Sequence, residues 1–180
     1  MPKEKKQIIL GVTASVAIYK ACDLVRRLRE NNFGVTVVMT QEAKELIRPA
    51  LFEAVSFNKV YTEMFNSDRV WEIEHISLAE KADLILIAPA TANIIGKLAN
   101  GICDDLLSCT VIASNAPVLI AAAMNTKMYQ NKIVQDNIKK LKTVGYKFIG
   151  PVEGNLACGK KGLGCLAGVE EIIKEVKRLL

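Results

Sequence analysis

The chain has 180 residues, a length that fits one domain whose core is large enough to need neither disulfides nor metals. Its hydrophobic content of 51% and charged content of 24% are typical of globular proteins, and its modest net charge of +5 suits an anionic ligand. The sequence has a single Trp, no nucleic-acid-binding motif and no apolar run near the roughly 18 residues that cross a bilayer. We therefore expect neither nucleic acid nor membrane as a partner.

The five cysteines are odd in number, and the polar N-terminal residues do not form a signal-peptide pattern. Both observations favour reduced thiols in a cytoplasmic protein. We expect no metal site, because the sequence contains no CxxC pair and only one histidine.

The first forty residues predict a βαβ unit. The segment Gln7–Thr13 is nearly continuously apolar, which is typical of a strand buried on both faces of a parallel sheet. Apolar residues then recur at helical spacing from Ala17 to Leu28, and Ser15 is placed to cap that helix. A second apolar strand, Val35–Met39, completes the unit.

Strands and helices continue to alternate along the rest of the chain. Residues 41–80 are less regular, and within them the segment Val70–Glu80 contains the sole histidine, His75. The alternation predicts a single domain, residues 1–180, of the α/β class, with a Rossmann-like or flavodoxin-like doubly wound, mainly parallel sheet and helices on both faces. We expect further strands at Leu84–Ala88, Val118–Ala122 and Tyr146–Ile149, and helices at Gln41–Ile47, Pro49–Val55, Asn93–Ala99, Asp105–Ser114 and Lys127–Leu141 and from Val169 to the end.

The stretch Gly154–Gly168 holds five of the eleven glycines and two cysteines. Because glycine loses the most backbone freedom on ordering, we expect a loop there and not a helix or a regular strand. A loop of this length in a compact domain is usually a lid or a binding loop. Cys158, next to a glycine and close to Lys160 and Lys161, fits an accessible thiol.

Ligands of doubly wound sheets bind beyond the carboxyl ends of the strands, where several polar residues of this chain are expected. The turn Gly11–Ser15 could hold a phosphate at a helix N-terminus, whereas Thr40 stands where a dinucleotide site needs an acidic residue. The segment Pro89–Asn93 offers hydroxyl and amide groups, and Asn125 offers an amide that could bind a carboxylate. Each also has a purely structural interpretation, as a tight turn or a helix cap, and His75 alone is more often an ordinary histidine.

Taken together, these segments resemble the homo-oligomeric flavin-containing cysteine decarboxylases over nearly the whole chain. Five motifs in a suitable order are more specific than any one of them. They are G-V-T-A-S-V-A-I-Y-K (Gly11–Lys20), H-I-S-L (His75–Leu78), P-A-T-A-N-I-I-G-K-L-A-N-G-I-C-D-D-L-L (Pro89–Leu107), A-A-M-N-T-K-M-Y (Ala122–Tyr129) and L-A-C-G-K-K-G-L-G (Leu156–Gly164).

The resemblance implies a Rossmann-like flavoprotein that binds FMN and assembles as a homotrimer or a homododecamer. It further implies that the flavin lies near subunit contacts, so that a monomer has an incomplete site. By position in the motifs, the residues implied to surround FMN are Gly11, Thr13, Ala14, Ser15, Val16, Thr40, Thr91, Ala92, Asn93, Ile94, Ser108 and Ala123.

Within the family, the motifs are most similar to those of the branch that converts 4′-phosphopantothenoylcysteine into 4′-phosphopantetheine in coenzyme A synthesis. That reaction oxidises the substrate thiol with FMN, loses CO2 and then reduces the ene-thiol, so no nicotinamide is needed. The resemblance implies His75 as the active-site base, Asn125 as the residue that binds the substrate carboxylate and Cys158 as the proton donor. It also places Met124, Ala157 and Gly159 against the substrate.

The chain departs from the family pattern at several positions, none of which removes an implied chemical residue. Ala14 replaces a usual glycine, Ala122 a proline and Tyr129 a tryptophan. Cys165-Leu166 stands where Arg-Met is common, which leaves the anchoring of the glycine-rich loop unexplained.

Three alternatives share the fold. A lantibiotic-type peptidyl-cysteine decarboxylase stops at the ene-thiol and is not expected to carry the A-C-G-x-x-G-x-G segment. A flavin prenyltransferase is disfavoured by His75 and the Met-Asn pair, and a non-catalytic FMN-binding regulatory protein by the three implied chemical residues. A ligase for the preceding step is expected on another polypeptide or on an extension of this one.

Overall fold

The computed structural model describes residues 5–65 and 73–180, which form a six-stranded sheet with a separate two-stranded hairpin. All pairings in the large sheet are parallel. The strand order β3-β2-β1-β4-β5-β6 is that of a Rossmann-type sheet, which confirms the predicted doubly wound α/β fold. The strands are β1 (Gln7–Val12), β2 (Gly34–Met39), β3 (Val60–Tyr61), β4 (Leu84–Ala90), β5 (Val118–Ala122) and β6 (Lys147–Ile149).

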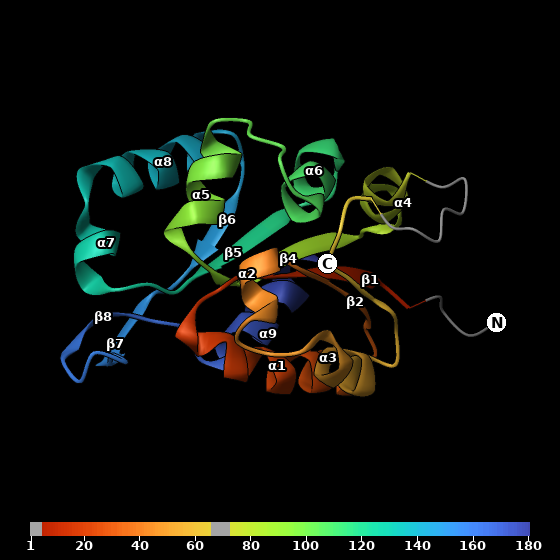
Figure 1. Cartoon of the computed structure of the whole chain (residues 1–180), viewed down its shortest axis with the longest axis horizontal. Coiled ribbons are helices and arrows are strands. Elements are labelled where there is room, and N and C mark those ends of the chain that lie inside the picture. The colour runs from red at the N-terminus through yellow and green to blue at the C-terminus, as the bar shows by residue number, and fades with distance from the viewer. Residues whose placement is uncertain (1–4, 66–72) are drawn as a thin grey trace.

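Helices cover both faces of this sheet, as Figure 1 shows. Side chains alternate along each strand, so Ile8 and Leu10 enter one core cluster and Ile9 enters the other. The first cluster is covered by α1 (Tyr19–Glu30), α3 (Pro49–Ser56) and α9 (Val169–Leu179), and the second by α4 (Glu74–Lys81), α5 (Ala92–Ala99), α6 (Leu106–Ala113) and α8 (Lys132–Thr143).

The predicted helix Lys127–Leu141 is two helices, α7 (Thr126–Gln130) and α8. Asn131 is extended, with φ −60° and ψ 132°, and its side chain accepts a hydrogen bond from the Ile133 N–H at 2.9 Å. The break therefore comes from an N-cap inside a stretch that has helical periodicity. The short helix η1 (Val16–Ile18) and strand β3 were not predicted, and the helix α2 (Gln41–Lys44) is shorter than expected.

The prediction of an irregular loop over Gly154–Gly168 was wrong. Two antiparallel strands, β7 (Val152–Asn155) and β8 (Lys161–Cys165), form a hairpin through this region. The Met124 N–H donates to the Gly164 carbonyl oxygen at 3.0 Å, so β8 lies directly against the end of β5. Tertiary packing thus overrides the weak strand propensity of glycine.

Part of the segment Val70–Glu80 lies outside the described residues, and from Glu74 on the segment belongs to α4. No helix within the two described ranges is long and apolar enough to cross a membrane.

Candidate active site

The strand order reverses direction between β1 and β4, and the turns that follow these two strands are tied together. The Thr13 hydroxyl donates to the Pro89 carbonyl oxygen at 2.7 Å and accepts from the Thr91 N–H at 3.1 Å. Thr13 is only 2% exposed. This buried link joins two of the segments that the sequence predicted to meet at the carboxyl end of the sheet.

The turn after β1 enters the short helix η1 through Ser15. The Ser15 hydroxyl caps η1 by accepting from the Ala17 N–H at 3.4 Å. The sequence predicted Ser15 as the cap of the longer helix, but α1 begins only at Tyr19 and has no side-chain cap. The hydroxyl retains its own proton, so it can still donate to a ligand. The turn after β4 is similar, because Thr91 caps α5 by accepting from the Ile94 N–H at 3.5 Å.

A cavity of about 560 Å³ lies between these turns and the β7–β8 hairpin. This volume is in the range of small-molecule and cofactor sites. Predicted residues that line it are Ala14, Ser15, Val16, Thr91, Ala92, Ala123, Met124, Asn125, Ala157 and Cys158. Residues that line it without having been predicted are Ala17, Tyr19, Lys20, Met128, Asn155, Leu156, Gly164, Cys165 and Leu166.

Asn125 and Cys158 meet across this cavity, although they lie on different elements. The Asn125 side-chain oxygen accepts from the Lys127 N–H at 2.9 Å and caps α7. Its amide nitrogen is therefore turned toward the hairpin, where it approaches the Cys158 sulfur at 4.0 Å. Because only the N–H side of the amide is free, Asn125 presents a hydrogen-bond donor and suits a carboxylate.

Cys158 lies at the tip of the hairpin and is exposed. The tip is closed by two backbone hydrogen bonds, from the Leu156 N–H to the Lys160 oxygen at 2.8 Å and from the Gly159 N–H to the Leu156 oxygen at 2.9 Å. Gly159 has φ +78°, a conformation that other residues rarely adopt. The tight tip therefore holds the thiol over the cavity.

Two glycines let β8 approach the turn after β5. A Cβ at Gly164 would overlap the Met124 carbonyl oxygen, and a Cβ at Gly162 would lie 2.5 Å from the Thr126 hydroxyl oxygen. Both glycines face the body of the protein, because alternate residues of a strand share a face. The G-x-G spacing in this motif therefore seats the hairpin, which local propensity could not reveal.

Several predicted residues do not line the cavity: His75, Gly11, Thr13, Thr40, Asn93, Ile94, Ser108 and Gly159. His75 is half-buried on α4, and Figure 1 shows α4 and the β7–β8 hairpin on opposite sides of the molecule. The structure therefore does not bring His75 and Cys158 of one chain together. Thr40 is 9% exposed and caps α2, with Oγ1 accepting from the Ala43 N–H at 3.4 Å.

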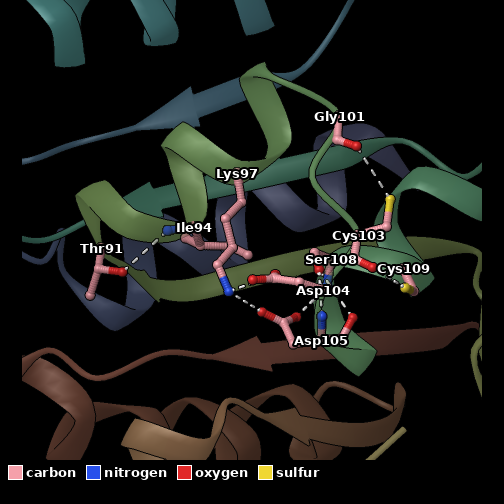
Figure 2. A network of polar contacts seen from close by, with 9 residues as sticks. All are labelled: Thr91, Ile94, Lys97, Gly101, Cys103, Asp104, Asp105, Ser108 and Cys109. Atoms are coloured by element: carbon pink, nitrogen blue, oxygen red, sulfur yellow. Dashed lines mark hydrogen bonds and ion pairs between the residues drawn. The ribbon is translucent and has the colours of Figure 1, made fainter.

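Ser108 is fully buried in a network of polar contacts at the start of α6 (Figure 2). Its N–H donates to the Asp105 carboxylate at 2.7 Å, and its hydroxyl accepts from the Asp105 N–H at 3.2 Å, which makes a capping box for α6. The hydroxyl also donates to the Asp105 carbonyl oxygen at 3.0 Å. Through these contacts Ser108 stabilises the start of α6, and its contact with the flavin stays a prediction.

The same network also contacts α5 near its C-terminal end, through Lys97. Lys97 forms ion pairs with Asp104 at 2.8 Å and with Asp105 at 2.7 Å. Burial works to raise the pKa of Asp105, but the hydrogen bonds from Lys97 and Ser108 outweigh it and lower the pKa below its usual value. Asp105 is therefore ionised at neutral pH and links α5 to α6.

Some of the unpredicted lining residues could have been found from the sequence motifs. Tyr19 and Lys20 belong to the first motif and lie one helical turn after Ser15 and Val16. Met128 belongs to the Met-Asn motif in the same way. Leu156 and Gly164 belong to the glycine-rich motif, whereas Asn155, Cys165 and Leu166 lie outside it and required knowledge of the hairpin.

A family model described as Flavoprotein matches residues 1–180. The chain belongs to the flavoprotein family. In sequence it is 43% identical over 177 residues to the probable phosphopantothenoylcysteine decarboxylase of Streptococcus mutans, with 97% of this chain and 99% of the relative covered.

Other relatives of this flavoprotein are longer. It is 47% identical over 169 residues to the coenzyme A biosynthesis bifunctional protein CoaBC of Bacillus subtilis. The match covers 94% of this chain but 42% of that relative, so the chain spans less than half the length of such bifunctional relatives.

Solved structures agree with this family assignment. A Cys-to-Ser mutant of PPC decarboxylase complexed with pantothenoylaminoethenethiol matches with a TM-score of 0.82 and 29% identity, covering 97% of this chain and 98% of that one. The FMN-dependent cysteine decarboxylase SpaF matches with a TM-score of 0.83 and 30% identity, covering 94% of each chain.

Proposed function

We propose that this chain binds FMN and converts 4′-phosphopantothenoylcysteine into 4′-phosphopantetheine with loss of CO2. The observation that carries the proposal is the Asn125 amide nitrogen facing the Cys158 sulfur across the cavity. A donor for a carboxylate and a thiol for proton transfer are what a cysteine decarboxylase needs at one place. The Streptococcus mutans relative, similar over its whole length, supports the substrate.

The residues around the cavity fit FMN. Hydroxyls of Ser15 and Thr91, each with a proton free to donate, lie at two helix N-termini beside the cavity. Apolar lining from Val16, Met124 and Met128 suits a flat ring. Bound FMN supplies a two-electron oxidation of the substrate thiol, and later the return of those electrons to the ene-thiol.

The chain's own residues bind, orient and protonate the substrate. Asn125 donates its N–H to the substrate carboxylate, and the Lys127 N–H fixes that orientation. Cys158 gives its proton to the substrate carbon as the ene-thiol is reduced. Because the hairpin tip holds this thiol, the last step depends on the seating of β8.

The function is tested by incubating the purified protein with 4′-phosphopantothenoylcysteine and measuring FMN content, CO2 and product mass. We expect a yellow protein that releases CO2 and forms 4′-phosphopantetheine. A peptide ending in cysteine serves as the second substrate, and turnover of that peptide alone would favour the peptidyl-cysteine class. A protein that binds no flavin and turns over neither substrate would contradict the proposal.

Replacement of Cys158 tests the proton donor. In Cys158→Ser we expect CO2 release to continue while formation of the reduced product falls by about 100-fold or more, since a positioned acid contributes roughly that factor. The solved complex of a Cys-to-Ser relative with pantothenoylaminoethenethiol supports this expectation. Cys165→Ser is the matched control, because Cys165 lines the same cavity. Reduced product at the full rate in Cys158→Ser would remove Cys158 from this role.

We also propose that the working form is a homotrimer or a multiple of trimers in which His75 of one copy serves the cavity of another. The support is that His75 does not line the cavity that holds Cys158. A cytoplasmic location is consistent with five unpaired cysteines.

Complementation between two variants that each fail to form the reduced product tests this arrangement. We expect His75→Asn to block oxidation and Cys158→Ser to block reduction, whereas oligomers co-expressed from both recover part of the wild-type rate of reduced product. The control carries both substitutions on one chain and is assayed by itself. Mixed oligomers that make no more reduced product than the separate variants would refute a site shared between copies.

A further inference from the structure

One charged side chain lines the cavity. Lys20 is the sole charged residue among those described there, and none of the described lining residues is acidic. The other half-buried lysines of the described chain have carboxylate partners: Lys97 pairs with Asp104 and Asp105, and Lys44 pairs with Glu63. The described ion pairs include none that contains Lys20, whose ammonium lies 5.9 Å from the centre of the Tyr19 ring.

The position of Lys20 in α1 makes the lack of a partner costly. It is the second residue of α1, and the first turn of that helix contains no acidic residue. The N-terminal end of a helix already carries a partial positive charge, so a cation there is unfavourable unless an anion lies nearby. Lys20 is half-buried and lines the cavity, so its charge adds there to the partial positive charge of the helix end.

We propose that Lys20 is the counter-ion of a phosphate monoester bound in this cavity. The inference rests on the proposed function, which brings two such groups to the site: the phosphate of the cofactor and the phosphate of the substrate. A phosphate dianion matches the observations because it accepts hydrogen bonds on several oxygens at once, from the Lys20 ammonium and from a hydroxyl such as that of Ser15. A neutral ligand would leave the charge unpaired.

The test removes the charge but keeps the aliphatic stem, with Lys20→Met. Lys139→Met is the matched control, because Lys139 is an exposed lysine on α8 and its loss changes the net charge equally. Fluorescence titration of the apoprotein with FMN and with riboflavin forms one arm. The other arm compares kcat/KM for 4′-phosphopantothenoylcysteine with kcat/KM for pantothenoylcysteine.

We expect the preference for the phosphorylated ligand to fall by about tenfold in one arm, the size of a charge-assisted hydrogen bond. A loss confined to FMN over riboflavin assigns Lys20 to the cofactor phosphate, and a loss confined to the substrate pair assigns it to the substrate phosphate. Unchanged preferences in both arms would overturn the proposal. If the wild-type protein turns over neither substrate, the proposed function fails while the flavin arm still decides the role of Lys20.

Discussion

The two walls of the cavity are held in place by different means. The inner wall consists of the turns after β1, β4 and β5, and Thr13 ties two of these turns through a buried hydroxyl. The outer wall is the β7–β8 hairpin, whose strands contribute no described residue to either core cluster. It is seated through the Met124–Gly164 hydrogen bond and through close approach at glycine.

Because of this difference, we expect changes in the two walls to affect different properties of the protein. The inner wall shares its atoms with the core, so a change there should weaken the fold together with cofactor binding. The outer wall carries the reactive thiol on a hairpin that packs little apolar surface, so a change there should alter the reaction while the protein stays folded. Substitutions in the hairpin, in the turn after β1 and in the polar network between α5 and α6 test this difference between the two walls.

The largest effect is expected in the outer wall, from Gly164→Ala. The added methyl group would overlap the Met124 carbonyl oxygen, so β8 must move away from β5 and Cys158 must move with it. A displacement of about 1 Å at a reacting group can cost roughly 100-fold, and we expect the rate of reduced product to fall by about that factor. Quenched kinetics with product mass analysis provide the measurement.

The melting temperature should change little in this variant, because neither strand of the hairpin belongs to a core cluster. Lys161→Ala is the control, since Lys161 lies on the same strand and its side chain is exposed. A Gly164→Ala protein with the wild-type rate, or one that unfolds with the core, would show that the hairpin is not the independent wall described above.

A smaller effect is expected in the inner wall from Thr13→Val, and it should lower the stability of the fold instead of the reaction rate alone. This isosteric change removes the donor to Pro89 and leaves the Thr91 N–H without its acceptor. We expect the free energy of unfolding to fall by about 2 kcal/mol, the usual cost of a buried group left unsatisfied. Urea unfolding measures it, and FMN affinity should weaken in parallel because Thr91 lines the cavity.

Thr143→Val provides the control, because the Thr143 hydroxyl bonds only the Lys140 carbonyl oxygen at the exposed end of α8. Its unfolding free energy should stay within about 0.5 kcal/mol of the wild type. Equal losses in the two variants would mean that the link between the turns adds no particular stability.

The sheet and the inner wall could be predicted from the sequence because their signals are local. Strands buried on both faces are continuous apolar runs such as Leu84–Ala88, and their order along the chain determines which turns share the carboxyl edge. The polar residues after these strands, among them Ser15, Thr91 and Asn125, then had to lie near one another. The cavity contains all three.

The hairpin and the positions of His75 and Lys20 depend on contacts that no local pattern encodes. Gly162 and Gly164 reduce strand propensity, yet they are needed because another segment lies against β8. His75 lies in a helical motif whose distance from Cys158 follows only from the fold. For Lys20, the sequence shows a charge but not the absence of a carboxylate among the residues that line the described cavity.

The smallest effect is expected from Asp105→Asn, in the polar network between α5 and α6. Asparagine can still cap α6, so the substitution removes chiefly the ion pair with Lys97 that links α5 to α6 (Figure 2). Asp105 has a lowered pKa in the folded protein, so its ionised form stabilises the fold above the usual carboxyl pKa, and that contribution disappears as the pH falls through the lowered value.

At pH 7 we expect Asp105→Asn to be less stable than the wild type by about 1 kcal/mol, since Lys97 keeps its second partner, Asp104. The difference should shrink once the pH falls below about 4, where the Asp105 carboxylate of the unfolded wild-type chain takes up a proton, and should vanish below the lowered pKa of the folded protein. Urea unfolding of both proteins across this range is the measurement. If the difference in unfolding free energy stays constant from pH 7 to strongly acidic pH, the geometry of the cap, and not the charge of Asp105, stabilises the contact between α5 and α6.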